Sequence, residues 1–124
     1  MKTAIVVLSD PANGSEEALG RVFNALAAAY DCKARGMEVI VLFQGAGTRW
    51  IRELGRTDNP VHALYVAVKD TIAGASAGCA AFFEVTDDVS ESGHTLIGEN
   101  PVPGTPGLPS IARLLAEGYR VVTF

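Results

Sequence analysis

The chain has few of the side chains that catalysis and metal binding use most often. Its 124 residues include two cysteines, two histidines and one tryptophan. His62 and His94 do not stand at metal-ligand spacing with either cysteine, so we expect no metal site, and no cofactor is predicted. Cys32 and Cys79 form no Cys-x-x-Cys pair, which favours two reduced thiols over a disulfide.

Clustered positive charge and long apolar runs are also missing. The ten Lys and Arg residues are spread along the chain, and the formal net charge is −4 at pH 7. This distribution excludes the basic patch that binds nucleic acid or an anionic membrane surface. The first apolar run, Ala4 to Leu8, is too short for a signal peptide or a membrane span. We therefore expect a cytoplasmic protein with no nucleic acid and no membrane as partner.

Apolar residues are abundant, at 48% of the chain, which suffices for the core of one domain over residues 1–124. Short runs that read as buried strands cover 4–8, 39–43, 71–75, 95–97 and 120–124. Segments with helical signals lie between them, at 15–36, 48–54, from 60 onward, 80–83, 86–92 and 110–117. This alternation predicts an α/β fold with three layers, α/β/α, and a mostly parallel sheet of about five strands, as in flavodoxin-like architectures.

The first predicted helix carries two different faces. An apolar stripe at helical spacing predicts the side that packs on the core: Leu19, Val22, Phe23, Leu26 and Tyr30. The second face holds small residues, namely Ala18, Ala25, Ala28, Ala29 and Cys32. Such a face would let another helix or another subunit come close, although alanine is also simply a good helix former.

Cys79 has the most informative setting in the chain. It follows a run of small residues, Gly74 to Gly78, at the point where a strand should feed a helix. In a parallel α/β protein this is the carboxyl edge of the sheet, where ligands gather, and a helix start favours the reactive thiolate. Backbone N–H groups of residues 78–81, and Arg49 if the loops converge, would add positive field. The alternative is a buried thiol that only fills space.

Two more loops are expected at the same edge. Asn13-Gly14-Ser15 opens the first helix, and Gln44-Gly45 follows the second strand. Exposed amides at a helix start suit phosphate, sulfate or a carboxylate. Neither loop completes a Gly-x-Gly-x-x-Gly or Walker fingerprint, so the pattern favours Asn13, Gln44 and Gly45 as ordinary turn residues over an anion site.

Four stretches, in order, resemble the DsrE/DsrF-like sulfur-relay family. They are the opening strand with Ser9 to Gly14 and the long helix, then 39–47, 74–79 and 109–124. The resemblance implies a homo-oligomer, a trimer or hexamer, with a persulfide on the catalytic Cys79. It also implies that the site is bordered by Asn13, Gln44, Gly45, Ser76 and Gly78. Two positions depart from some relatives: Ser76 replaces a second cysteine, and Leu108 replaces a histidine.

These observations support three functional hypotheses. In the first, a DsrE-like protein accepts sulfane sulfur on Cys79 from a donor protein and passes it to an acceptor thiol. If active, it would be a sulfurtransferase-like carrier, and the loop over 99–109 would cover the cysteine or reach a neighbouring subunit. In the second, a flavodoxin-like module binds a small molecule or nucleotide, with Cys79 only lining the pocket. In the third, the chain is a non-catalytic oligomeric scaffold.

Overall fold

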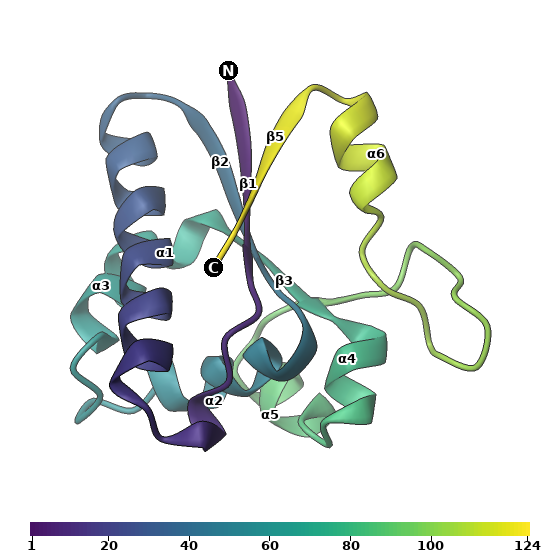
Figure 1. Ribbon diagram of the computed structural model, residues 1–124, viewed down its shortest axis with the longest axis horizontal. Coiled ribbons are helices and arrows are strands. Elements are labelled where there is room, and N and C mark those ends of the chain that lie inside the picture. Colours follow the sequence, from purple (N-terminus) through teal and green to yellow (C-terminus); the bar gives the residue numbers. More distant parts are fainter.

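The computed structural model describes residues 1–124 and contains one sheet of five strands (Figure 1). The strands are β1 (Lys2–Val7), β2 (Glu38–Phe43), β3 (Ile72–Ser76), β4 (Leu96–Ile97) and β5 (Tyr119–Thr123). They lie in the order β4-β3-β2-β1-β5, and every neighbouring pair is parallel. The predicted parallel sheet is confirmed, and all carboxyl ends of its strands therefore meet at one edge.

Helices cover both faces of this sheet, as predicted. The α-helices are α1 (Glu16–Ala34), α2 (Trp50–Leu54), α3 (His62–Val68), α4 (Ala77–Phe82), α5 (Thr86–Glu91) and α6 (Ile111–Ala116). Three short 3-10 helices are η1 (Pro11–Asn13), η2 (Gly45–Arg49) and η3 (Lys69–Thr71). Helices α1 and α3 lie on one side of the sheet, and α6 lies on the other (Figure 1). None of the helices combines the length and the apolar character needed to cross a membrane.

The two faces of the sheet bury very different cores. The α1 side holds a cluster of 20 buried residues, whereas the α6 side holds four: Ala4, Val6, Leu42 and Leu114. Strand β1 contributes to both, because side chains alternate along a strand: Ile5 and Val7 point to the large core, Ala4 and Val6 to the small one. The uninterrupted apolar run of β1 thus marks a central strand, as expected.

Helix α1 is rotated relative to the predicted orientation. Val22 and Leu26 are buried as expected, but Phe23 and Tyr30 are 49% and 53% exposed. The small face packs on the sheet instead, with Ala18, Ala25 and Ala29 buried in the large core. The suggestion that this small face receives another subunit is therefore wrong. Small side chains are used here because they let α1 lie close to the strands of its own sheet.

The ends of α1 follow the sequence signals. The Ser15 hydroxyl accepts a hydrogen bond from the backbone N–H of Ala18 at 3.0 Å, which is an N-cap. Beyond the helix, Gly36 has φ +70°, and the Met37 N–H returns to the Cys32 carbonyl at 2.9 Å. This is the left-handed ending that glycine permits.

Two predicted helix starts are wrong. Thr48 caps nothing: it is buried inside η2, and its hydroxyl donates to the Gly45 carbonyl at 2.8 Å. Pro60 is not the first residue of a helix, because the Asn59 side chain accepts the Val61 N–H at 2.8 Å. That local turn delays α3 until His62. In both places a side-chain hydrogen bond to nearby backbone competes with the helix that the residue type suggested.

Candidate functional site

Cys79 lies in the first turn of α4, directly after β3. Ser76 ends the strand and also caps the helix, since its hydroxyl accepts the Cys79 N–H at 3.1 Å. Helix α4 therefore begins at Ala77 rather than at the predicted Ala80. The small residues that resembled a turn are helical because a serine cap allows the strand to pass into the helix without a loop.

The proline-rich segment 99–109, here called the arm, contacts the start of α4 with its base, where Asn100 and Leu108 pair. The Gly78 N–H donates to the Gly107 carbonyl at 2.7 Å. A Cβ atom on Gly78 would stand 2.7 Å from Leu108 Cδ1 and 3.1 Å from the Gly107 oxygen, so the arm packs closely on this residue. Leu108, the position where some relatives carry a histidine, is therefore packed against the residue before Cys79.

The base of the arm is fixed, while its tip extends from the body (Figure 1). Asn100 and Leu108 exchange backbone hydrogen bonds of 2.7 and 2.9 Å across the base. The Glu99 carboxylate accepts from Arg113 Nε at 3.0 Å and from the Ser110 N–H at 2.9 Å. The Arg113 hydrogen bond, followed by the Ser110 N–H, lowers the pKa of Glu99. The base of the arm thus contacts the start of α4 at Gly78, the residue before Cys79, and its tip is free of the body.

The backbone amides at the start of α4 are largely engaged. Of the four amides at residues 78–81 that were expected to add positive field, Gly78 donates to the Gly107 carbonyl and Cys79 donates to the Ser76 hydroxyl. Cys79 itself is half-buried, and its Sγ atom has no hydrogen-bond partner. What remains near the sulfur is the positive end of a helix of six residues.

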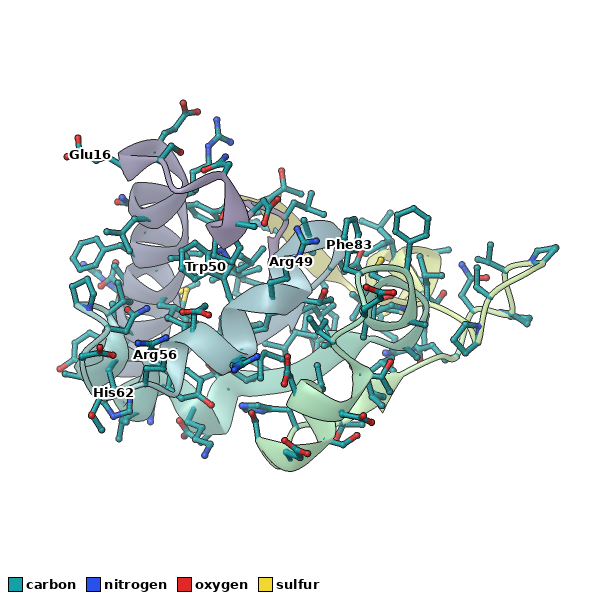
Figure 2. All side chains as sticks on the ribbon, turned by 90° about the horizontal axis from the view of Figure 1, so that it is seen from below. Glu16, Arg49, Trp50, Arg56, His62 and Phe83 are labelled. Atoms are coloured by element: carbon teal, nitrogen blue, oxygen red, sulfur yellow. The ribbon has the colours of Figure 1, made fainter.

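Arg49 lies next to α4, as expected if the loops converge, but its charge is already paired. Its Nη1 atom stands 3.1 Å from both carboxylate oxygens of Asp10. Its Cζ atom lies 5.0 Å from the centroid of the Phe83 ring, and the side chain reaches toward that ring in Figure 2. Beside it, Trp50 is buried and donates its indole N–H to the Ser9 hydroxyl at 3.1 Å. These contacts fasten η2 to its neighbours.

The other predicted site residues lie at the same carboxyl edge. Gln44 follows β2 and donates its backbone N–H to the Val7 carbonyl at 3.0 Å, while its side-chain Nε2 is buried without a partner. Gly45 opens η2 with φ +57°. Asn13 lies on η1, where its side-chain oxygen accepts the Ser15 N–H at 2.8 Å. Ser76, Gly78 and Cys79 thus share one junction, η2 packs against it, and Asn13 serves its own turn.

The largest hollow of the molecule combines Gly14, Ser15 and Arg49, which the sequence analysis named, with residues that it did not single out. It has a volume of about 580 Å³, and it lies between the start of α1, η2–α2 and the α4–α5 connection. Its charged lining combines two arginines with three carboxylates: Arg49, Arg52, Glu53, Glu84 and Asp88. Cys79 does not line this hollow. The sequence did not predict this hollow, because its three segments are distant along the chain and come together only in the folded structure.

Both histidine rings form hydrogen bonds with other residues of the chain. His94 Nε2 lies 2.7 Å from the Tyr65 hydroxyl oxygen, and His62 Nδ1 lies 2.7 Å from the Leu54 carbonyl oxygen. Burial, with a smaller effect from Lys69, lowers the pKa of His94. The structure contains no group of three or more His, Cys, Asp or Glu side chains arranged to hold a metal ion.

A comparison with protein families decides the classification. The model of the DsrE/DsrF-like family matches residues 1–124. The chain belongs to this family. Neither the curated proteins nor the solved structures contain a match. Family membership confirms the resemblance of the four stretches, and it implies a sulfur-relay-type protein. In this DsrE/DsrF-like chain, Cys79 lies at the β3–α4 junction.

Proposed function

We propose that the chain carries sulfane sulfur as a persulfide on Cys79 and transfers it to the thiol of a partner protein. The observation that carries this proposal is the place of Cys79: in the first turn of a helix, at the carboxyl edge of the sheet, in a DsrE/DsrF-like chain. The other cysteine, Cys32, lies near the far end of α1 and packs against the large core.

The chemistry needs a thiolate and no external oxidant. The Cys79 thiolate attacks the outer sulfur of a donor persulfide, so that a new S–S bond forms and the donor's S–S bond breaks. The donor leaves as a thiolate, and the proton stays on the transferred sulfur. In the second step an acceptor thiolate attacks that outer sulfur and releases Cys79 as a thiolate. Each step is a thiol–disulfide-type exchange without net oxidation.

The structure offers two features that support such a carrier. Cys79 lies in the first turn of α4, where the partial positive charge of the helix start is found. The half-burial of Cys79 limits water access to a bound persulfide while leaving the sulfur accessible to a partner. Leu108 keeps the neighbourhood apolar, so in this chain no histidine at that position assists the thiol.

The test is loading with inorganic polysulfide followed by intact-mass measurement. The expected product is heavier by about 32 Da, the mass of one sulfur atom. Cys32→Ser protein should gain this adduct, and Cys79→Ser protein should not. Incubation of the loaded Cys32→Ser protein with a small-molecule thiol should return it to its original mass.

Loading that survives in Cys79→Ser protein, or that occurs only on Cys32, would overturn the proposal. An adduct on Cys79 that no thiol removes would also contradict it, since a carrier must release its sulfur. Far-UV circular dichroism of each variant separates a lost site from a lost fold.

The partners and the assembly state are part of the same proposal. The resemblance implies a donor and an acceptor protein in the cytoplasm, and a homo-oligomer of three or six subunits. The mass of the native particle by light scattering tests the oligomer directly. A monomer at all concentrations would contradict that part while leaving the chemistry of Cys79 open to its own test.

The hollow of about 580 Å³ favours a second function, small-molecule binding, over the scaffold alternative. It borders Gly14 and Ser15 at the start of α1, but the Ser15 N–H and hydroxyl are already bound to Asn13 and Ala18. The cradle for a phosphate is therefore incomplete. Thermal shifts with FMN and with nucleotides test this function, and a shift lost in Arg52→Ala protein would support it over the sulfur carrier.

A further inference from the structure

Gln44 carries the one buried side-chain nitrogen or oxygen atom of the structure that has no hydrogen-bond partner, the amide Nε2. Its backbone N–H is used, because it donates to the Val7 carbonyl at 3.0 Å. Its side chain does not cap η2, although Gln44 stands at the cap position of that helix. A buried donor without an acceptor destabilises a fold. No contact within the chain accounts for this amide.

The Gln44 side chain lies on the α6 side of the sheet, since side chains alternate along an extended strand. Phe43 belongs to the large core on the α1 side, and the backbone of Gln44 is still extended, with φ −133° and ψ 163°. Ser76 lies on the α6 side as well, because the preceding Ala75 is part of the large core. The side chain of Gln44 and that of the residue that caps α4 therefore share one side of the sheet edge.

Gln44 and Ser76 are also neighbours across two strands. The last paired residues of β2 and β3 are Phe43 and Ala75, and Gln44 and Ser76 directly follow them. Parallel strands lie about 4.8 Å apart. The Ser76 hydroxyl accepts the Cys79 N–H at 3.1 Å. The Gln44 amide therefore lies one strand away from the group that holds the backbone of the cysteine.

The Cys79 side chain approaches this place from α4. Cys79 and Phe83 are four residues apart, so they lie on the same face of the helix. The Phe83 ring lies against Arg49, whose Cζ atom is 5.0 Å from the ring centroid (Figure 2). Arg49 belongs to η2, which begins directly after Gln44. Side chains on a helix lean toward its first turn, which brings the sulfur toward the end of β3.

A persulfide would change what the Gln44 amide can reach. It extends from Cys79 Sγ by one S–S bond of about 2.0 Å. Its outer sulfur, once ionised, accepts hydrogen bonds about twice as strong as those of a neutral acceptor. The amides of Gly78 and Cys79 already donate to the Gly107 carbonyl and the Ser76 hydroxyl. Gln44 Nε2 is a free donor beside this junction, and it makes no hydrogen bond with Sγ itself.

We propose that Gln44 Nε2 donates a hydrogen bond to the outer sulfur of the Cys79 persulfide and so binds the sulfur in transit. This inference rests on the proposed sulfur carriage by Cys79. The bond forms only in the loaded protein, because the unloaded thiol lacks the outer sulfur. Gln44 therefore stabilises the loaded state relative to the unloaded one, and it holds the outer sulfur in a fixed position for the acceptor thiolate.

The first experiment replaces the outer sulfur by a cyano group, which extends from Sγ in the same way and accepts a hydrogen bond. Cys32→Ser protein is cyanylated on Cys79, and the infrared band of the nitrile is recorded. A hydrogen bond to the nitrile nitrogen raises the wavenumber of this band, so Gln44→Leu should lower it. Cyanylated Cys32 in Cys79→Ser protein is the matched control, and its band should not respond to Gln44→Leu. An unchanged band on Cys79 would overturn the proposal.

The second experiment measures polysulfide loading by intact mass in Cys32→Ser protein. Gln44→Leu should require about tenfold more polysulfide for half loading, because the loaded state loses one hydrogen bond. Gln44→Glu, which removes the donor at nearly the same size, should show the same direction of change. Loading of both variants at the wild-type polysulfide concentration would overturn the proposal.

Two further readouts separate sulfur binding from a structural role of Gln44. Gln44→Leu should unfold at the same urea concentration as the parent protein or at a higher one, because the variant removes an unpaired buried donor. It should also leave the alkylation rate of the unloaded Cys79 thiol unchanged. A marked loss of stability would show a structural role and overturn the proposal. If the parent protein takes up no sulfur, the carrier function fails, and the nitrile band still decides whether Gln44 reaches a group on Cys79.

Discussion

The two faces of the sheet differ in how they are built. On the α1 side, α1 and α3 bury a cluster of 20 residues. On the α6 side, one short helix covers a cluster of four, and the arm leaves that side of the body. Burial of apolar surface is the main favourable contribution to folding, so the α1 side holds most of the stability.

The largest loss of stability should come from Leu26→Ala in the large core on the α1 side of the sheet. Leu26 is fully buried in the large core, surrounded by α1 and the strands beneath it. Its removal leaves a cavity that a close-packed core does not fill, and we expect a loss of about 4–5 kcal/mol in the free energy of unfolding. Urea unfolding of the variant measures it. A loss no larger than that of a surface substitution would contradict the assignment of stability to this layer.

Leu114→Ala makes the same change of side chain in the small core on the α6 side of the sheet. Leu114 is also buried, but it packs in a small cluster beside half-buried neighbours such as Ile111 and Tyr119. Such a site collapses or admits water more easily, so the expected loss is about 2–3 kcal/mol. The same urea experiment applies. Equal losses for Leu26→Ala and Leu114→Ala would break the comparison between the two faces.

Gly78→Ala tests the seat of the arm. The added Cβ would lie 2.7 Å from Leu108 Cδ1 and 3.1 Å from the Gly107 oxygen, so the Leu108 side chain must move and the Gly107 backbone must give by a few tenths of an ångström. Overpacking of this kind costs about 1–3 kcal/mol, and here it should also speed both proteolysis of the arm and alkylation of Cys79. Gly55→Ala, where the nearest atom is 3.4 Å from the added Cβ, is the control. Unchanged cleavage and alkylation would show that the arm does not depend on Gly78.

The smallest expected effect is a pH dependence of the folding stability that arises from His94. Burial and Lys69 lower the pKa of His94 below its ordinary 6.5, so the folded protein keeps the ring neutral while the unfolded chain takes up a proton. This contribution to stability is complete above pH 6.5, and it is lost as the pH falls toward the lowered pKa. His94→Gln protein should lose less stability than wild type over that range in urea titrations. Parallel losses would exclude His94 as the cause.

Much of the fold follows from local signals in the chain. The uninterrupted runs of β1 and β2, the Ser15 cap, Gly36 after α1 and the Ser110 cap of α6 all act over a few residues, and the structure has each of them. The errors at Thr48 and Pro60 are also local, but there a side-chain hydrogen bond to a neighbouring backbone group competed with the helix. Residue type alone does not rank such competitors.

The candidate site was predicted in part. Sequence placed Cys79 at a strand-to-helix junction on the carboxyl edge, because alternation of strands and helices fixes which ends of parallel strands meet. It did not show that Gly78 is the seat of the arm, that Ser76 turns its hydroxyl to the helix backbone, or that Asp10 pairs with Arg49. The contacts of Gly78 and of Asp10 join segments far apart in the sequence, whose distance in space depends on the strand order, whereas the Ser76 cap is local.

By itself, then, the sequence determined the elements, their alternation, the parallel sheet and the thiol at its edge, since periodicity and capping act within one segment. The tertiary structure decided which side of α1 is core. Val22, Phe23, Leu26 and Tyr30 fit one helical stripe, yet only Val22 and Leu26 are buried, because the close approach of α1 to the sheet selects its alanine side. It also decided that two arginines and three carboxylates share a hollow. Such relations depend on packing between distant segments, which no local pattern encodes.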